Sequence, residues 1–282
     1  MKNNINEFIS LNEFSKNKWF SVKDLLIFNN QIFVSYTDEI KKDCWNTSLI
    51  YADLNYEYIK FKKLFLSDQC VHSVNNPDKE FNGHQSGGRI ISLDKDNILL
   101  SIGEYRSRYL AQDKNSINGK IVKIEINSGK SEIISMGHRN VQGLHLDDEK
   151  KILLITEHGP VGGDEINLIY KDKIKKGEIF NFGWPIASYG EHVSKNLYKK
   201  YPLKKSHIKA GFIEPLKSFS PGIGISEIVK INKDKFVLSS LKEKSIYFFE
   251  LNEYDKIINL KKIKIFERIR DLKFYNGKLY LF

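Results

Sequence analysis

Short runs of β-branched and aromatic residues alternate along the chain with clusters of residues that favour turns. Asn-Asn, Asp-Lys-Asp-Asn and Asn-Gly are typical of these clusters. No segment keeps a 3.6-residue hydrophobic period, and residues 171–178 are predicted to form only one or two helical turns. We therefore predict an all-β protein. The predicted strands cover residues 24–28, 31–36, 48–54, 59–66, 89–93, 97–102, 120–126, 132–135, 142–146, 152–156, 165–169, 225–231, 235–239, 245–251, 261–266, 271–274 and 278–281.

A strand, a polar turn and a second strand recur four times, as in IISLDKDNILLSIGE and IVKINKDKFVLSSLK, and a fifth copy, DLKFYNGKLYLF, ends the chain. Their spacing of roughly 45–70 residues is typical of propeller blades with loop insertions, although a β-sandwich also has many short strands. The pattern predicts about four four-stranded units and two strands of a fifth. An incomplete ring exposes strand edges. We therefore expect a piece of a longer chain, a partner that covers the gap, or closure as a smaller ring.

The composition is that of a globular protein, with 41% hydrophobic and 12% aromatic residues among 282. The net charge of +10 comes from scattered lysines, which indicates a solvated surface rather than a nucleic-acid site and still allows anionic small ligands. Residues 1–18 have no apolar core of a signal peptide, and no apolar run has the length of a membrane span. For Cys44 and Cys70 we expect a reduced, buried pair; a disulfide between neighbouring strands is the alternative and would imply an oxidising compartment.

Polar residues concentrate in residues 136–168, at the ends of two predicted buried strands. Side chains at strand ends are held by a rigid sheet, which is where functional sites are commonly built. Each residue alone could belong to an ordinary solvated turn, but the cluster as a whole favours a site. Its members are Arg139, Asn140, Gln142, Glu157, His158, Asp164 and Glu165.

Two loops carry candidate catalytic residues. His84 lies in the Gly-rich segment FNGHQSGGRI, and histidine is the usual general base near neutral pH. Arg139 and Asn140 share the loop GHRN, and arginine binds carboxylates or phosphates through two hydrogen bonds. A solvated histidine and a structural arginine are the competing interpretations.

Further along the chain, the sequence predicts a cation site and an anion site. The glycines and Pro160 of EHGPVGGDE force an irregular backbone whose carbonyls, with Asp164 or Glu165 nearby, suit Ca²⁺; a plain glycine-rich turn is the alternative. Arg268 and Arg270 are two residues apart, so on one extended strand they would face the same side. Together with Lys242 they would form a strong anion site.

Read in order, these motifs resemble a known family. GHQSGGRI, NGKIVKI, GHRNVQGLHLD, TEHGPVGGDEINLI, NFGWPIASYG, SPGIGIS, SSLK and RIRD are similar to the successive motifs of the soluble glucose/sorbosone dehydrogenases. The resemblance covers the chain from about residue 30 to its end. These quinoprotein aldose sugar dehydrogenases use pyrroloquinoline quinone (PQQ) and fold as six-bladed β-propellers. The resemblance implies a single propeller domain over residues 1–282, incomplete at about four and a half blades, without the first blade and the closing strands.

For the reacting groups, the resemblance implies that His84 takes the proton of the anomeric hydroxyl while a hydride moves to the quinone. Arg139 would stabilise the negative charge that develops on the quinone oxygens, and Asn140 would contact them. Gln85 and Asp164 would lie beside the sugar.

For the cofactors, the resemblance implies PQQ and Ca²⁺. The backbone carbonyls of Gly159 and Pro160 match those that hold Ca²⁺, and His158 stands where the soluble glucose enzyme has Gln. Lys242, Arg268 and Arg270 match basic residues that pair with the carboxylates of PQQ, which is a tricarboxylate and needs a cationic pocket.

Two positions depart from the family pattern: Gly83 replaces an Asp before the catalytic His, and Glu104 stands where Asp is usual. The resemblance implies oxidation of an aldose to its lactone, with electrons passed to an external acceptor such as a quinone, cytochrome or dye. It also implies a periplasmic or secreted protein, although no export signal is visible. The alternative is a non-catalytic propeller that binds carbohydrate or protein, which would not need the five residues His84, Arg139, Lys242, Arg268 and Arg270 together.

Overall fold

The computed structural model describes residues 2–10, 12, 18–174 and 177–282. They form two compact units, Met1–Met136 and Gly137–Phe282, which we describe one at a time. Strands dominate both units, and the α-helix α2 covers only Lys171–Ile174. The all-β prediction is confirmed, and so is a short helical turn after residue 170. In these ranges, no helix is long and apolar enough to cross a membrane.

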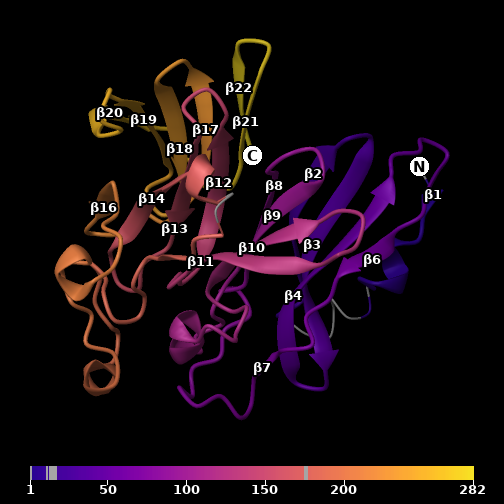
Figure 1. The fold of residues 1–282 in the computed structure, drawn as a ribbon, viewed down its shortest axis with the longest axis horizontal. Coiled ribbons are helices and arrows are strands. Elements are labelled where there is room, and N and C mark those ends of the chain that lie inside the picture. Colours follow the sequence, from indigo (N-terminus) through magenta and orange to yellow (C-terminus); the bar gives the residue numbers. More distant parts are fainter. Residues whose placement is uncertain (1, 11, 13–17, 175–176) are drawn as a thin grey trace. The chain divides into compact units, whose positions relative to one another are not determined.

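The first unit contains two antiparallel sheets whose strands follow chain order (Figure 1). The hairpin after residue 28 shows why the chain turns where it does. Asn29 and Asn30 form its two-residue turn, and both have the positive φ that such a turn requires. The first sheet is β2 (Ser21–Phe28), β3 (Gln31–Lys41), β4 (Cys44–Asp53) and β6 (Lys62–Phe65), and β7 (Val71–His72) pairs with the start of β4. The second is β8 (Gly87–Ser92), β9 (Asn97–Ile102), β10 (Lys120–Glu125) and β11 (Ser131–Met136).

The core of this unit lies between the two sheets. Leu49 from β4 and Leu100 and Val122 from the second sheet are fully buried there. On its other face, the first sheet buries Val34 and Ile50 against Ile9 of the N-terminal segment. That segment also holds β1 (Lys2–Asn3), which pairs in parallel with β5 (Tyr58–Ile59).

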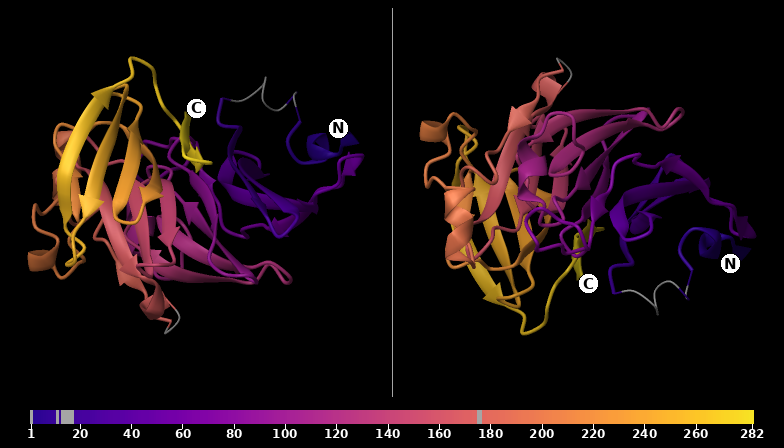
Figure 2. Two further views of the ribbon diagram at one scale, coloured as in Figure 1. Left: turned by 90° about the horizontal axis from the view of Figure 1, so that it is seen from above. Right: turned by 90° about the horizontal axis from the view of Figure 1, so that it is seen from below.

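The second unit contains two further antiparallel sheets and a hairpin. The sheet that comes later in the chain is β17 (Ile225–Asn232), β18 (Lys235–Ser240), β19 (Ser245–Leu251) and β20 (Ile257–Lys264). These strands lie side by side in chain order and are coloured orange to yellow in Figure 2. Leu154, Ile166, Ile228 and Leu238 form the core between the two sheets. The first sheet is β12 (Val141–Asp147), β13 (Ile152–Glu157), β14 (Asp164–Tyr170) and β16 (Lys217–Phe219). The hairpin is β21 (Leu272–Tyr275) and β22 (Lys278–Leu281), and β15 (Phe180–Asn181) is a further short strand.

The described residues form four sheets of four or five strands, the two-stranded ladder of β1 and β5, and a final hairpin, which is close to the four units and two further strands that the sequence predicts. Some boundaries were wrong. The run 59–66 is broken into β5 and β6, and the strand predicted at 261–266 is β20, which starts four residues earlier. The short strands β7, β15 and β16 were missed, because two or three residues carry no detectable alternation. The single six-bladed domain stays a prediction.

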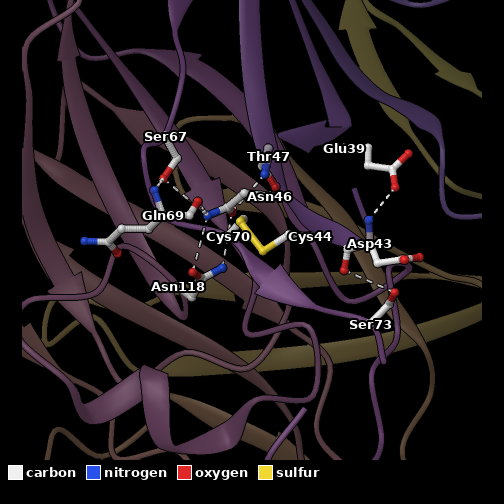
Figure 3. The surroundings of a disulfide bond; sticks show 10 residues. All are labelled: Glu39, Asp43, Cys44, Asn46, Thr47, Ser67, Gln69, Cys70, Ser73 and Asn118. Atoms are coloured by element: carbon white, nitrogen blue, oxygen red, sulfur yellow. Dashed lines mark hydrogen bonds between the residues drawn. A yellow bond between two sulfur atoms is a disulfide. The ribbon is translucent and has the colours of Figure 1, made fainter. Parts of the chain in front are cut away.

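The two cysteines form a disulfide, so the expectation of a reduced pair was wrong (Figure 3). The reason is the short strand β7, which pairs with β4 and brings the Cα atoms of Cys44 and Cys70 to 5.3 Å. Beside the disulfide, the Asn46 amide donates to the Gln69 carbonyl at 2.8 Å, and the Asn118 amide donates to Asn46 Oδ1 at 3.2 Å. The first bond joins β4 to the loop that carries Cys70, and the second joins β4 to the segment before β10.

Candidate active site

The polar cluster of residues 136–168 lies at one end of the β12–β13–β14 sheet. Because these strands are antiparallel, the start of β12, the end of β13 and the start of β14 meet there, with Val141 opposite Glu157 and Glu157 opposite Glu165. The His158 N–H donates to the Asn140 carbonyl at 3.1 Å and closes this end. The strand-end arrangement predicted from the sequence is confirmed.

Arg139 is the buried cation of this cluster. Its Nη1 donates to the His158 carbonyl at 3.2 Å, and its guanidinium carbon lies 5.6 Å from the centre of the Trp184 ring. Its backbone N–H donates to Glu157 Oε2 at 2.9 Å. The cavity beside it, ≈ 10 Å³, has about the size of one water molecule. The cavity is lined by Arg139, Glu157, His158, Gly159, Gly163, Glu165, Phe182, Trp184, Ala187 and Ser188.

Two buried carboxyl groups, Glu157 and Glu165, face each other across β13 and β14. Glu157 Oε1 accepts from the Asn167 amide at 2.9 Å and lies 3.2 Å from His138 Nδ1. Burial, reinforced by the charge of Glu157, raises the pKa of Glu165 well above its usual range. Glu157 thus orients the Arg139 loop. From the sequence, Glu165 was expected only as a possible neighbour of Ca²⁺ and Glu157 only as a member of the cluster, although their positions at the ends of two adjacent strands could have signalled the pair.

Asp164 joins the two sheets of the second unit. Its Oδ1 accepts from the Gly159 N–H at 3.0 Å, and its Oδ2 accepts from the N–H groups of Gly224 at 2.6 Å and Ile225 at 3.1 Å. Both carboxylate oxygens are therefore engaged by the backbone. The structure shows a positioning role for Asp164, and its contact with a sugar stays a prediction.

The loop between His158 and Asp164 is packed so tightly that glycine is required. Gly163 has φ +69°, and a Cβ there would lie 2.2 Å from the Gly190 nitrogen. A Cβ on Gly159 would lie 2.2 Å from the Gly162 carbonyl oxygen. Backbone oxygens therefore crowd this loop, and they are the donor type that Ca²⁺ prefers. Among the described residues, no group of three or more His, Cys, Asp or Glu side chains could hold a metal ion, so Ca²⁺ here would rely on backbone oxygens such as those predicted at Gly159 and Pro160.

Two of the predicted basic residues can be tied to this end of the second unit. The Lys242 N–H donates to the Ile223 carbonyl at 3.1 Å, directly beside the Gly224 that binds Asp164. Burial lowers the pKa of His158, and the positive charges of Arg139 and Arg270 lower it further, against the opposite effect of Asp164. The Ser226 hydroxyl donates to the Arg270 carbonyl at 2.5 Å, which ties Arg270 to the start of β17.

Arg268 and Arg270 lie between two strands, as the predicted strands 261–266 and 271–274 imply, so the single extended strand considered for them does not form. β20 ends at Lys264 and β21 begins at Leu272, so both arginines belong to the connection between them. They are exposed on either side of the buried Ile269, so they still face away from the core together.

His84 and Gln85 lie on one loop of the first unit. The His84 N–H donates to Asn82 Oδ1 at 2.9 Å, and the Gln85 N–H donates to the Asn82 carbonyl at 3.0 Å. His84 is exposed, and its ring centre lies 5.3 Å from that of Trp19. Gln85 is buried, so its predicted contact with substrate stays a prediction. Trp19 was not singled out from the sequence. The departure from the family pattern at Gly83 could have indicated that another side chain occupies the space beside that position.

The family model and two curated proteins that match this chain are described as sugar dehydrogenases. The family model described as Glucose / Sorbosone dehydrogenase matches residues 26–282. Aldose sugar dehydrogenase YliI of Escherichia coli is 31% identical over 213 residues, which cover 68% of this chain and 54% of that protein. Quinoprotein glucose dehydrogenase B of Acinetobacter calcoaceticus is 35% identical over 130 residues, 45% of this chain and 21% of that protein. The chain thus spans about half the length of YliI and a smaller share of the Acinetobacter calcoaceticus enzyme.

Solved structures show the same fold. The soluble aldose sugar dehydrogenase of Escherichia coli in its apo-form has a TM-score of 0.75 at 26% identity, over 93% of this chain and 79% of that one. The PQQ-bound aldose sugar dehydrogenase of Streptomyces coelicolor has a TM-score of 0.67 at 20% identity, over 90% of this chain and 69% of that one. At that identity, the second likeness concerns the fold alone.

Proposed function

Because the chain belongs to the glucose/sorbosone dehydrogenase family, we propose that it oxidises an aldose sugar at the anomeric carbon to the lactone. The proposed cofactor is PQQ, and the proposed final acceptor of the electrons is an external quinone, cytochrome or dye. The observation that carries the proposal is the buried Arg139, bonded to the His158 carbonyl beside a small cavity and next to a loop crowded with backbone oxygens.

The residues of the second unit fit PQQ by charge. A tricarboxylate needs several cations. The Arg139 side chain bonds to the His158 carbonyl, and the backbones of Lys242 and Arg270 bond to Ile223 and Ser226, on either side of the residues that hold Asp164. When bound, PQQ supplies a quinone that accepts a hydride. We propose that Arg139 and Asn140 contact the quinone oxygens, with His158 beside them, and that Lys242, Arg268 and Arg270 bind the carboxylates. The PQQ-bound relative from Streptomyces coelicolor supports this choice of cofactor through its shared fold.

The protein's own part in the reaction is to hold the sugar, remove a proton and stabilise charge. We propose that the His84 imidazole, in its neutral form, takes the proton of the anomeric hydroxyl. Its exposure on a hydrogen-bonded loop supports this role. Arg139 is fixed by Glu157 and by the His158 carbonyl, so its charge needs little reorganisation during the reaction. Gln85 and Asp164 are proposed beside the sugar.

We propose that Ca²⁺ binds the carbonyls of Gly159 and Pro160. The crowded backbone oxygens of this loop support a hard cation with oxygen ligands. We also propose a periplasmic or secreted location. The Cys44–Cys70 disulfide supports it, because disulfides persist in oxidising compartments.

The experiment is reconstitution of the purified chain with PQQ and CaCl₂, followed by dye reduction with a panel of aldoses and with non-reducing sugars. We expect turnover with aldoses only, and none without PQQ. A chain that binds a sugar in calorimetry but shows no PQQ-dependent turnover would instead be the carbohydrate-binding alternative.

A further inference from the structure

Position 83, directly before His84, carries glycine because Trp19 occupies the space of its side chain. A Cβ at Gly83 would lie 2.9 Å from Trp19 Cβ, 3.1 Å from Cε3 and 3.2 Å from Cδ2. Gly83 is outside the left-handed region, so the backbone itself does not require glycine. The requirement comes from packing. A substitution at either position must therefore affect the other.

Trp19 is held in place by backbone hydrogen bonds and by packing of its indole. The Thr37 hydroxyl donates to the Trp19 carbonyl at 2.5 Å and accepts from the Ser21 N–H at 2.7 Å, which ties the residue to β3. The indole packs on the buried cluster formed by Phe20, Trp45, Val71 and Tyr105. Its ring also meets that of Phe81 edge to face, with centres 5.5 Å apart. Its position is thus set by the core of the first unit.

Hydrogen bonds that do not involve Trp19 fix the backbone of the His84 loop. The Asn82 N–H donates to the Tyr105 carbonyl at 3.1 Å, and the Tyr105 N–H donates to the Gln85 carbonyl at 3.0 Å. The Ser86 carbonyl accepts from the Gly103 N–H and from the Thr47 hydroxyl, both at 2.8 Å. With the backbone fixed, the remaining freedom of His84 is rotation of its side chain.

Trp19 limits that rotation. The two rings meet at 66° with their centres 5.3 Å apart, which is an edge-to-face contact. We propose that Trp19 is the positioning residue of the His84 imidazole, and that Gly83 is its necessary companion. The inference rests on the proposed function only in naming His84 as the base; the ring contact itself can be tested without activity.

The first test is NMR of the histidine ring carbons and their protons, without PQQ or sugar. The His84 signal, one of seven, is identified by its loss in His84→Gln. We expect Trp19→Ala to shift this signal and to sharpen or broaden it, because the ring current and the rotational restriction are lost. The matched control is Tyr56→Ala, which removes another aromatic side chain of the same unit that is 79% exposed. A His84 signal unchanged in Trp19→Ala would overturn the proposal, whether or not the chain is an enzyme.

The second test is kinetic. With equal PQQ binding, we expect Trp19→Ala to lower kcat about tenfold with KM changed less than about twofold, since misplacing a reacting group affects the chemical step. Trp19→Phe, which keeps an aromatic wall, should recover most of the rate. Unchanged kcat in folded Trp19→Ala would overturn the positioning role, whereas absence of turnover in the wild type would overturn the proposed function and leave the NMR test decisive.

A double-mutant cycle tests the companion role of Gly83. Gly83→Ala should lower kcat and shift the His84 signal in the wild-type background, because the new Cβ pushes against Trp19. In Trp19→Gly, all three close atoms are gone, so the same substitution should cost much less. Additive effects would contradict the coupling. Circular dichroism and thermal unfolding check that each variant is folded.

Discussion

The Gly224 N–H donates to Asp164 Oδ2 at 2.6 Å and so ties the turn before β17 to the first residue of β14. Gly159 binds the other oxygen of the same carboxylate. One side chain therefore fixes the glycine loop proposed for Ca²⁺ and the sheet whose second strand leads into Lys242.

Asp164→Asn should destabilise the protein by about 1–3 kcal/mol, because an amide nitrogen cannot accept and leaves a buried N–H unsatisfied. The measurement is urea unfolding at neutral pH. Asp172→Asn, an exposed acidic residue of the same unit, is the control and should change the free energy of unfolding by less than about 0.5 kcal/mol. Equal effects of the two substitutions would show that the Asp164 bonds do not hold the loop.

His145 should make the free energy of unfolding depend on pH below 6.5. Burial lowers the pKa of His145 from 6.5 to about 4, with Asp147 raising it and Lys230 lowering it. The unfolded chain binds the proton first, so this contribution is complete above pH 6.5 and is lost as the pH falls towards 4. The loss amounts to at most about 3 kcal/mol. Urea unfolding of wild type and His145→Gln between pH 4 and 7 measures it. Parallel curves for the two proteins would contradict the assignment.

The strand pattern could be predicted because hydrophobic alternation and turn residues are local features. Asn29-Asn30 illustrates this, since the turn that the sequence predicts is the turn observed. β7 could not be predicted, because its two residues pair with β4 only after β4 has formed. The Cys44–Cys70 disulfide depends on that pairing, so it too was beyond the local sequence.

The disulfide should stabilise the first unit. It closes a loop with a sequence separation of 26 residues, which corresponds to about 3.5 kcal/mol of lost unfolded-state entropy. Urea unfolding with and without reductant should show a difference of this order, and Cys44→Ala/Cys70→Ala should remove the dependence on reductant. A mass of the native chain that does not change on reduction would contradict the bond.

The sequence could predict that Arg139, Asn140 and His158 gather at the ends of neighbouring strands, because they directly precede or follow apolar runs; their roles stay predictions. The sequence could not show interactions that depend on register or packing. Glu157 faces Glu165 only because β13 and β14 pair in one register, and Trp19 reaches Gly83 from 64 positions away in the sequence. The roles of these residues became visible only with the fold.

Arg139→Lys should weaken PQQ binding about tenfold and lower kcat/KM about a hundredfold. A lysine cannot both donate to the His158 carbonyl and stack on Trp184 while presenting further donors. Equilibrium dialysis with PQQ and dye-reduction kinetics measure the two effects separately. Wild-type affinity in a folded variant would mean that the Arg139 guanidinium does not contact the cofactor.

We have proposed that this chain is a PQQ-dependent sugar dehydrogenase with His84 as its base, and one paired measurement on wild type and variant separates cofactor binding from catalysis. PQQ binding and aldose-dependent dye reduction are measured on the same preparations of wild type and His84→Ala with Ca²⁺ in excess. We expect equal PQQ binding in both, turnover in the wild type, and a rate lower by about a hundredfold or more in the variant. Failure of the wild type to bind PQQ, or equal turnover in both proteins, would contradict the proposal.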